Sequence, residues 1–403
     1  MMPPSSKPKN ALLPIFLIVS VDVLGMTIIL PLLPFYAERY GATPQVVGIL
    51  MTTYSLCQLV AGPILGRLSD RWGRRPLLLV SQLGTFAGFI ILGLARSLPL
   101  IFLSRFLDGI TAGNLSLAQA YISDVTEPEN RAKAFGLIGI AFGMGFLIGP
   151  AVSGYLAQFN YAYPAFAAAA LSLTSVLCTY FLLPQVIPHA GGEGEPGPGG
   201  ERLGLLDWNV YLEYFKRPGL NLLLVEFFSF CFMFAVFLSG FALFAERRFL
   251  AHGRPFGPQE VGYLFAYSGF LGIIIQGGLL GRLVKRFGER ALVRTGFLCA
   301  ALGLAAMGFV HPLWLFIPVF TMSSFGTSIL RPAITSLVTH QVGRREQGVV
   351  LGLTQSLFSL SMILAPLASG FLIQRGLLGA WALGAAGFAL IGLLIGPRSE
   401  KSS

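Results

Sequence analysis

Three carboxylic acids lie well inside long apolar runs, where charged side chains are rare. Asp22 lies about eleven residues into the first run, and Asp108 and Glu226 lie in the fourth and the seventh. A charge at the centre of a membrane span costs at least about 2.5 kcal/mol unless it is protonated, hydrated or paired. Each acid can therefore take up a proton or contact a ligand. The alternative for each is a structural role, such as a hydrogen bond to a neighbouring helix.

Arg105 and Asp108 are three residues apart, so they can form an ion pair on one helical turn. Protonation of Asp108 would release Arg105 and alter its hold on another group, so that proton binding could be coupled to an event at Asp22. The alternative is a permanently satisfied ion pair that only fixes its helix. At 100° per residue the same polar face continues through Ala112, Ser116 and Gln119.

An aromatic and methionine stripe follows Glu226, because Phe230 and Met233 continue its helix face. Rings attract cations and methionine adapts its shape, so this face suits a bulky, partly cationic organic ligand. Aromatic stripes also pack against lipid or other helices, and Glu226 lies near enough to the end of its run to be simply hydrated.

Three uncharged amides lie in the middle of the runs: Gln58, Gln276 and Gln355. Each of them either lines a ligand cavity or ties two helices together. The predicted proton-coupling residues are Asp22, Arg105, Asp108 and Glu226. The predicted substrate contacts are Asp22, Gln58, Gln119, Glu226, Phe230, Met233, Gln276 and Gln355.

The composition excludes several other kinds of chemistry. Of the 403 residues, 54% are hydrophobic and 11% are charged, whereas a soluble domain carries about 25% charged residues. The net charge of +10 comes from short basic clusters between apolar runs, which is typical of topology signals and not of nucleic-acid binding. The cysteines and histidines show no spacing of a metal site or a disulfide framework, and no Gly-Lys-Ser/Thr loop is present to bind ATP. We expect a membrane protein that is no enzyme and uses no cofactor.

The acids are positioned by apolar runs long enough to cross a membrane as helices, which takes about 20 residues. The runs predict an all-α membrane protein with twelve transmembrane helices, at approximately 11–37, 46–66, 76–95, 99–121, 134–156, 164–184, 219–245, 261–281, 291–310, 313–339, 348–374 and 378–396.

The twelve predicted helices form two six-helix halves with related sequences. A charged stretch at 66–75, the first hinge, returns 215 residues later at 281–290, the second hinge, with six of ten positions identical. Gly149-Pro150 and Ala365-Pro366 repeat at an offset of 216. A Gly- and Pro-rich hydrophilic segment separates the halves. The predicted domains are 1–184, a cytoplasmic linker at 185–218, and 219–403, pseudo-symmetric as in transporters built from parallel repeats.

Lys and Arg residues predict the orientation in the membrane. If both termini and the linker are cytoplasmic, that side carries 20 basic residues and the opposite side carries six. Because basic loops stay in the cytoplasm, both termini are predicted to be cytoplasmic.

The first hinge, with Gly66, Asp70, Arg71, Gly73, Arg74 and Arg75 in place, resembles the signature loop of the major facilitator superfamily. The resemblance implies a cytoplasmic latch that stabilises the outward-facing state and includes Gly66, Asp70, Arg71, Gly73, Arg74 and Asp124. The alternative is that the basic residues only enforce topology. In the second hinge Lys285 replaces the acid, so we expect no complete latch there.

Three further motifs resemble branches of that superfamily. Arg105-x-x-Asp108-Gly109 is similar to its helix-four motif, which often has Gln in place of Asp108. Gly145, Gly149, Pro150 and Gly154 resemble its antiporter motif, which implies that they shape the interface between halves and restrict proton leak. Asp22-x-x-Gly25 and Pro31-x-x-Pro34 resemble the twelve-helix drug/proton antiporters, particularly the tetracycline-efflux group.

The resemblance implies a proton-coupled efflux antiporter for amphipathic organic compounds or drugs, working by alternating access. Its partners would be a small-molecule substrate, protons and the lipid bilayer, with no nucleic acid, and it would be a monomer. We expect a multi-pass protein of the cell membrane, the inner membrane if the source is bacterial. One alternative is a proton-coupled importer or symporter of a sugar, organic acid or other nutrient. A remote alternative is a membrane receptor or scaffold.

Overall fold

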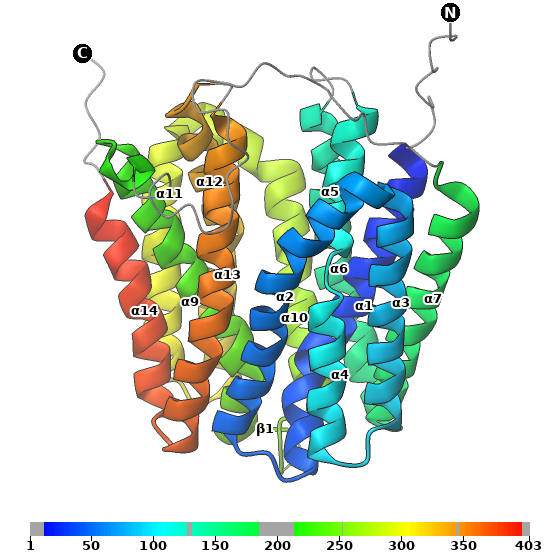
Figure 1. The fold of residues 1–403 in the computed structure, drawn as a ribbon. Coiled ribbons are helices and arrows are strands. Elements are labelled where there is room, and N and C mark those ends of the chain that lie inside the picture. The colour runs from blue at the N-terminus through cyan, green and yellow to red at the C-terminus, as the bar shows by residue number, and fades with distance from the viewer. Residues whose placement is uncertain (1–11, 127–130, 185–212, 252, 344–345, 397–403) are drawn as a thin grey trace, which may run out of the picture. The chain divides into compact units, whose positions relative to one another are not determined.

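A computed structural model describes residues 12–126, 131–184, 213–251, 253–343 and 346–396. These residues are predominantly helical (Figure 1). Helices suit apolar runs in a membrane because they satisfy their own backbone hydrogen bonds. The two strands, β1 (Leu250–Ala251) and β2 (Arg254–Pro255), form a short antiparallel ladder in which Leu250 lies opposite Pro255.

The helices before the predicted linker agree with the predicted spans except at the fourth. They are α1 (Leu12–Arg39), α2 (Pro44–Trp72), α3 (Arg74–Leu94), α4 (Leu98–Ile110), α5 (Asn114–Val125), α6 (Arg131–Ala157) and α7 (Ala162–Leu182). The fourth predicted span, 99–121, is divided between α4 and α5.

The helices after the linker agree with the prediction except at the eighth and ninth spans. They are α9 (Leu220–Arg248), α10 (Pro258–Ile274), the π-helical segment η2 (Ile275–Leu279), α11 (Leu280–Met307), α12 (Leu313–His340), α13 (Gln347–Gln374) and α14 (Leu378–Ile395). The eighth and ninth spans lie in one helical stretch that bends at Gly288, where φ is 79°.

Ten helices among the described residues are long and apolar enough to cross a membrane. The difference from twelve arises because α4 and α5 are each short, and because 258–307 is a single continuous stretch. The predicted helical membrane architecture is confirmed, with β1 and β2 as a short addition, and the count of twelve stays a prediction.

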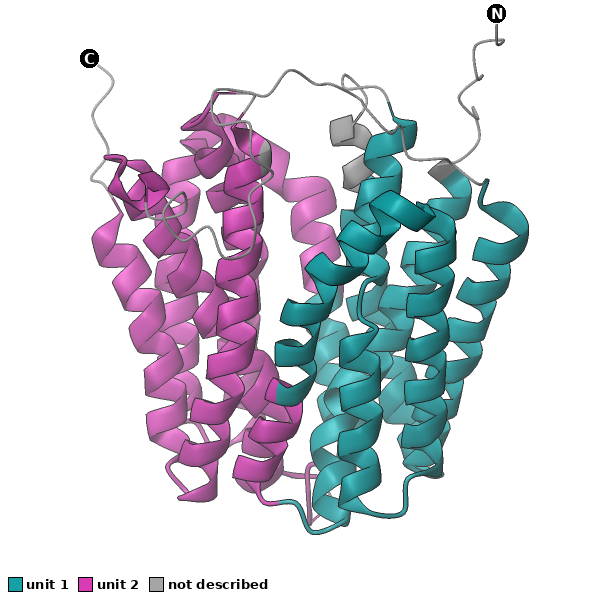
Figure 2. Ribbon diagram, in the orientation of Figure 1, with its two compact units in different colours: residues 1–42, 53–192, 257–269 teal, residues 43–52, 193–256, 270–403 magenta. Residues whose placement is uncertain are grey.

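The chain divides into two compact units that exchange one helix segment each (Figure 2). Unit 1 comprises 1–42, 53–192 and 257–269, and unit 2 comprises 43–52, 193–256 and 270–403. The start of α2 therefore belongs with α13 in unit 2, and the start of α10 belongs with α6 in unit 1. The domain bounds 1–184, 185–218 and 219–403 do not include this exchange and stay a prediction.

Close backbone contacts hold each exchanged helix segment in its unit. Equivalent contacts occur at equivalent positions of the sequence repeat. In unit 2 a side chain on Gly48 would collide with the main chain of Pro366, and in unit 1 one on Gly262 would collide with that of Pro150. Glycine allows these helices to approach at backbone distance. Since Pro150 and Pro366 are the repeated prolines found in the sequence, the repeat extends to the packing.

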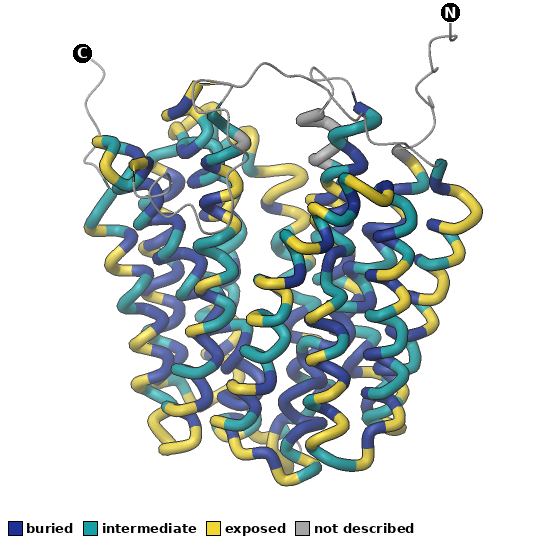
Figure 3. Tube along the Cα trace, in the orientation of Figure 1, coloured by how far each residue is buried: buried dark blue, intermediate teal, exposed yellow. Residues whose placement is uncertain are grey.

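Each unit has its own buried interior, and exposed residues alternate with buried ones along most of the helices (Figure 3). In unit 1 the interior includes Ile15, Leu78 and Tyr121. In unit 2 it is aromatic: Phe241 stacks with Phe316, and Phe244 stacks with Trp381. Many large apolar side chains remain exposed, as expected where lipid is the solvent.

The predicted linker is described only at its C-terminal end, because 185–212 lie outside the described residues. There Arg217 Nη2 lies 2.9 Å from Glu346 Oε1. This hydrogen bond holds the pKa of Glu346 below its usual range. Both side chains are more than a third exposed, so the pair fixes the position of the linker end and adds little stability.

Candidate functional site

The fourth predicted span is broken between α4 and α5, and Ser81 of α3 holds the break. The fully buried Ser81 hydroxyl donates to the Thr111 carbonyl and accepts a hydrogen bond of 2.9 Å from the Gly113 N–H. Buried backbone groups left without partners would cost about as much as a lost hydrogen bond. Ser81 therefore stabilises a helix interruption that begins three residues after Asp108.

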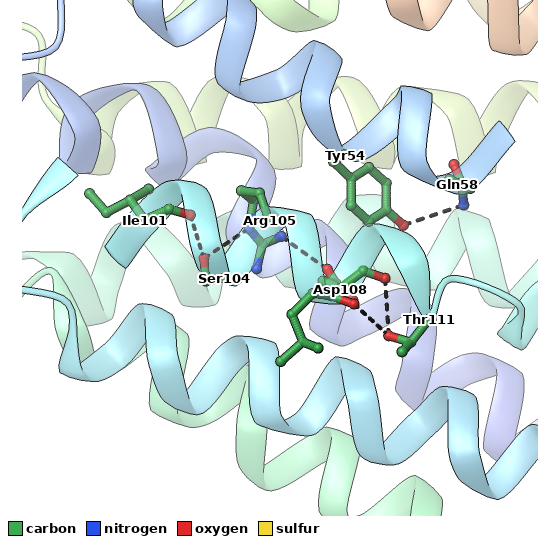
Figure 4. A network of polar contacts seen from close by, with 8 residues as sticks. Tyr54, Gln58, Ile101, Ser104, Arg105, Asp108 and Thr111 are labelled. Atoms are coloured by element: carbon green, nitrogen blue, oxygen red, sulfur yellow. Dashed lines mark hydrogen bonds and ion pairs between the residues drawn. The ribbon is translucent and has the colours of Figure 1, made fainter. Parts of the chain in front are cut away.

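Arg105 and Asp108 form the predicted ion pair on α4 (Figure 4). Arg105 Nη1 lies 3.1 Å from Asp108 Oδ2, and each residue is only 5% exposed. The guanidinium also lies over the Phe89 ring, 5.5 Å from its centroid. Arg105 Nη2 is buried and has no hydrogen-bond partner among the described residues. The pair therefore keeps one donor available for a further acceptor.

Tyr54 of α2 lies beside this pair, and the sequence reasoning did not single it out. Its charge interactions are with Asp108 and Arg105, and its hydroxyl accepts a 3.3 Å hydrogen bond from Gln58 Nε2 (Figure 4). The helices meet closely here, since a side chain on Gly109 would lie 2.7 Å from Cys57 Cβ. The sequence signal that could have identified Tyr54 is its spacing from Gln58, which lies one turn later on the same helix face.

Asp22 of α1 is turned toward α3 and α7. Its hydrogen-bonding neighbours are the Ser175 hydroxyl and the Gln82 amide, and its charge interacts with that of Asp108. Its Oδ1 atom is buried without a hydrogen-bond partner among the described residues. Gly25, one turn along α1, leaves room for Phe89, whose ring edge would lie 3.3 Å from a Cβ there. The acids of α1 and α4 thus belong to one polar cluster of unit 1.

Glu226 lies in a different environment from the one predicted. It is 1% exposed, and its Oε2 atom lies 3.0 Å from Arg290 Nη1 in the second hinge. Phe230 and Met233 are also buried, at 3% and 0% exposure. Their burial and the ion pair favour packing and a structural pair. Substrate contact and proton coupling at Glu226 stay predictions, without support from this geometry.

The four predicted amides are accessible, in contrast to the stripe after Glu226. All of them are exposed: Gln58, Gln119, Gln276 and Gln355. Gln276 Nε2 donates to the Ser328 carbonyl at 3.1 Å, which ties η2 to α12. Gln58 Nε2 donates to the Tyr54 hydroxyl on its own helix at 3.3 Å.

The first hinge is organised around Arg74. This guanidinium lies 2.8 Å from Asp70 Oδ1 and 2.8 Å from Asp124 Oδ2, which joins the turn to the end of α5. Gly73 has a φ of 96°, a conformation that glycine adopts without strain. Gly66, in contrast, makes no close contact that requires glycine, because a Cβ there would meet no atom within 4 Å. The Arg71 side chain is exposed. Arg74 thus contacts both acids of the predicted latch.

The second hinge carries a counterpart of the Arg74–Asp124 contact with its charges inverted, and the absence of a complete latch there stays a prediction. At the offset of 215, Glu289 replaces Arg74, and His340 lies 216 residues after Asp124. Glu289 Oε2 lies 3.7 Å from His340 Nδ1, and Glu289 Oε1 accepts a 2.6 Å hydrogen bond from Ser336. An acid on α11 therefore reaches the end of α12 as Arg74 reaches the end of α5. The ion pair exists only when His340 is protonated.

The glycines of α6 allow close packing of two neighbouring helices, α1 and α10, within unit 1. A side chain on Gly149 would collide with Thr27 of α1, and one on Gly145 would lie 2.6 Å from Val23 Cγ1. One on Gly154 would lie 3.0 Å from Gln259 Cα of α10. Pro150 contacts α10 through its carbonyl. The motif Gly145, Gly149, Pro150 and Gly154 thus allows close packing, and its part in limiting proton leak stays a prediction.

Gly154→Val is expected to destabilise the protein by about 1–3 kcal/mol, because over-packing forces neighbouring backbone to move. Thermal unfolding in detergent measures the change. Gly139→Val is the matched control, since a Cβ at Gly139 on the same helix meets no atom within 4 Å. Equal unfolding temperatures for the two variants would contradict the close contact between α6 and α10.

Among the described residues, no group of three or more His, Cys, Asp or Glu side chains is placed to hold a metal ion. The site brings together the Asp22 and Asp108 carboxyls and an Arg105 donor without a partner among the described residues, and proton exchange at the two acids stays a prediction.

Comparison with known proteins gives matches along almost the whole chain. The family model described as Major Facilitator Superfamily matches residues 15–279 and 249–403. The Escherichia coli tetracycline resistance protein, class C, is 31% identical over 392 residues, which cover 94% of this chain and 95% of that protein. The class B protein of Escherichia coli is 29% identical over 381 residues, covering 93% and 92%. The crystal structure of the human organic anion transporter MFSD10 (TETRAN) matches with a TM-score of 0.71 and 22% identity, covering 98% of this chain and 100% of that one.

Proposed function

Because the chain belongs to the major facilitator superfamily, we propose that this transporter is a proton-coupled efflux antiporter for amphipathic organic compounds. The multi-pass membrane fold and the transport class follow from the family, whose members are not enzymes. The tetracycline resistance proteins among its relatives support a drug as substrate and efflux as the direction. We further propose that it works as a monomer with both termini in the cytoplasm, as the basic residues predict.

The observation that carries the proposal is the polar cluster of unit 1. Asp22 and the buried Arg105–Asp108 pair lie on helices made mostly of apolar residues. Buried acids in membrane spans mark proton relays and ligand sites. A proton on Asp108 would neutralise the partner of Arg105 and release the guanidinium toward a substrate oxygen or another acid. Proton binding and substrate binding would thus compete for the same cationic group.

Accumulation in cells tests the function and separates it from the importer alternative. Cells that lack their own efflux systems are loaded with a fluorescent amphipathic compound or with tetracycline. Expression of this transporter is expected to lower accumulation, and a protonophore is expected to restore it. Increased uptake of sugars, organic acids or other nutrients, with unchanged drug levels, would favour a symporter. Unchanged transport of both groups would favour a receptor or scaffold.

We propose that the first hinge is a latch that holds one conformation of the transport cycle. In Arg74→Ala both ion pairs of Arg74 are lost, and hydrogen bonds to charged groups contribute about 1.5–3 kcal/mol each. Backbone amides of 66–75 and of the end of α5 are therefore expected to exchange hydrogen at least about tenfold faster, measured by mass spectrometry. Arg67→Ala, at an exposed position of the same hinge, is the control. Exchange that is equal in the two variants would contradict the latch.

A further inference from the structure

Arg331 is a charged residue well inside a membrane-spanning helix of unit 2. It lies nine residues before His340, where α12 ends, or about 13 Å along the helix axis. Its side chain is exposed, although α12 is long and apolar enough to cross a membrane. A guanidinium at such a depth is costly unless it is hydrated or paired. Arg331 therefore needs a polar partner.

The described residues do not provide that partner. The Arg331 guanidinium makes no hydrogen bond or ion pair with any of them. Its Cζ atom lies 5.4 Å from the centroid of the Phe358 ring of α13, and its charge interacts with the Cys231 thiol of α9. A ring face attracts the cation, but it gives the five N–H donors no acceptor oxygen. These donors are therefore available to a ligand.

The acids of unit 2 are engaged elsewhere. Five of them belong to the described residues, and one of these, Glu213, precedes α9 at the linker end. The other four contact other side chains: Glu226 contacts Arg290, Glu246 contacts Arg247, Glu289 contacts Ser336 and Glu346 contacts Arg217. Within the described part of unit 2, no carboxylate is thus left to neutralise Arg331.

The helix turn that carries Arg331 is fixed without any charge. Pro332 has no N–H group, so the Ser328 carbonyl four residues earlier loses its helical donor. Gln276 of η2 replaces that donor, since its Nε2 atom lies 3.1 Å from the Ser328 oxygen. Ser328 lies three residues before Arg331, on the same helix face. The bond therefore holds the backbone beside the guanidinium and uses none of the Arg331 donors.

A ligand for this position has two chemical parts. A guanidinium matches the two oxygens of a carboxylate with two parallel hydrogen bonds. The Phe358 ring offers an apolar surface beside it, and the exposed Gln355 amide lies one turn earlier on the same face of α13. We propose that Arg331 binds an anionic oxygen group of the transported compound, with Phe358 against its apolar part. The substrate class is then an amphipathic organic acid or zwitterion.

The inference rests on the proposed function in taking the ligand to be a transported compound, but binding tests it without transport. The purified protein is placed in phosphatidylcholine nanodiscs, and equilibrium dialysis measures the affinity for anthracene carboxylate and for anthracene carboxamide. The two probes share their shape and differ in charge. We expect the wild type to bind the carboxylate at least about tenfold more tightly, as hydrogen bonds to a charged group allow.

Arg331→Met is expected to remove this preference by weakening carboxylate binding, and to leave carboxamide binding unchanged. Arg331→Lys keeps the charge but lacks the planar fork, so it should retain only part of the preference. Arg286→Met is the matched control. Arg286 also lies over a ring, 5.3 Å from the centroid of Phe287, but it is exposed in the second hinge. This variant should bind both probes like the wild type.

The inference is overturned if the wild type does not prefer the carboxylate, or if Arg331→Met keeps the preference. If Arg331→Met fails to fold, Arg331→Lys decides: weaker carboxylate binding with unchanged carboxamide binding supports the site, and affinities equal to the wild type overturn it. Carboxylate binding that disappears in phosphatidylglycerol nanodiscs would assign Arg331 to a lipid headgroup and overturn the substrate role. The proposed function fails separately: carboxylate binding at Arg331 without any efflux would sink the efflux proposal and leave the anion site standing.

Discussion

If transport is coupled to protons as proposed, Asp22→Asn is expected to collapse the steady-state substrate gradient that a proton gradient drives. Moving one charge through 100 mV provides about 2.3 kcal/mol, which corresponds to a concentration ratio of about 50. An asparagine cannot carry the proton. If Asp22 carries the coupled proton, the concentration ratio should therefore fall from about 50 to about 1. Substrate exchange without a gradient should persist, because the side chains are nearly equal in shape. Proteoliposomes with labelled substrate measure both.

The control for this variant is Glu213→Gln, which removes an exposed carboxyl outside the polar cluster. It should keep the full gradient. If Asp22→Asn keeps the gradient as well, Asp22 is not the coupling acid, and Asp108 is the next candidate.

Arg105→Ala is expected to destabilise the protein by about 3–5 kcal/mol, because it leaves the buried charge of Asp108 without a partner. Asp108 is only 5% exposed, and the opposing Nη1 atom is 3.1 Å away. Substrate transport is expected to be lost as well, since the cluster loses its only guanidinium among the described residues. Chemical or thermal unfolding in detergent, together with substrate binding, measures the two effects.

The double variant Arg105→Met with Asp108→Leu separates stability from function. Replacement of a buried ion pair by apolar residues of similar volume is often neutral or stabilising. We therefore expect the double variant to unfold close to the wild type and to remain inactive in transport. Recovered transport would show that the pair is structural, which is the alternative that the sequence left open.

The sequence predicted the helices and the family motifs because these depend on local patterns. Apolar length determines where α1, α3 and α7 lie, and Gly73 marks the turn of the first hinge. The break after Ile110 was not predictable in the same way. No proline marks it, and it depends on Ser81, which comes from a different helix.

The partners of the buried acids depend on contacts between helices, which helical spacing does not reveal. Arg105 and Asp108 were predicted correctly as neighbours because they lie on one turn. Glu226 was read as part of a ligand face, whereas its partner Arg290 lies 64 residues further along the chain. Gln82 and Ser175 were missed as neighbours of Asp22, because each is a polar residue in an apolar run with no sequence signal of its own.

The two hinges show how a repeat keeps an arrangement while its residues change. Arg74 bonds to Asp124 in the first half, and Glu289 faces His340 in the second. The absence of a complete second latch was predicted from Lys285 alone and stays a prediction, although the contact at the end of α12 has its counterpart. Both partners changed sign together, so the attraction can persist when His340 carries a proton.

Proton movement in proteoliposomes tests the central claim most directly. The purified transporter is reconstituted with a pH-sensitive dye inside, no pH gradient is imposed, and tetracycline or another amphipathic substrate is added outside. Antiport predicts that substrate entry drives protons out and makes the lumen alkaline, and that Asp22→Asn abolishes this change. A lumen that becomes acidic with substrate entry would indicate symport. Substrate entry with no proton movement in the wild type would contradict proton coupling altogether.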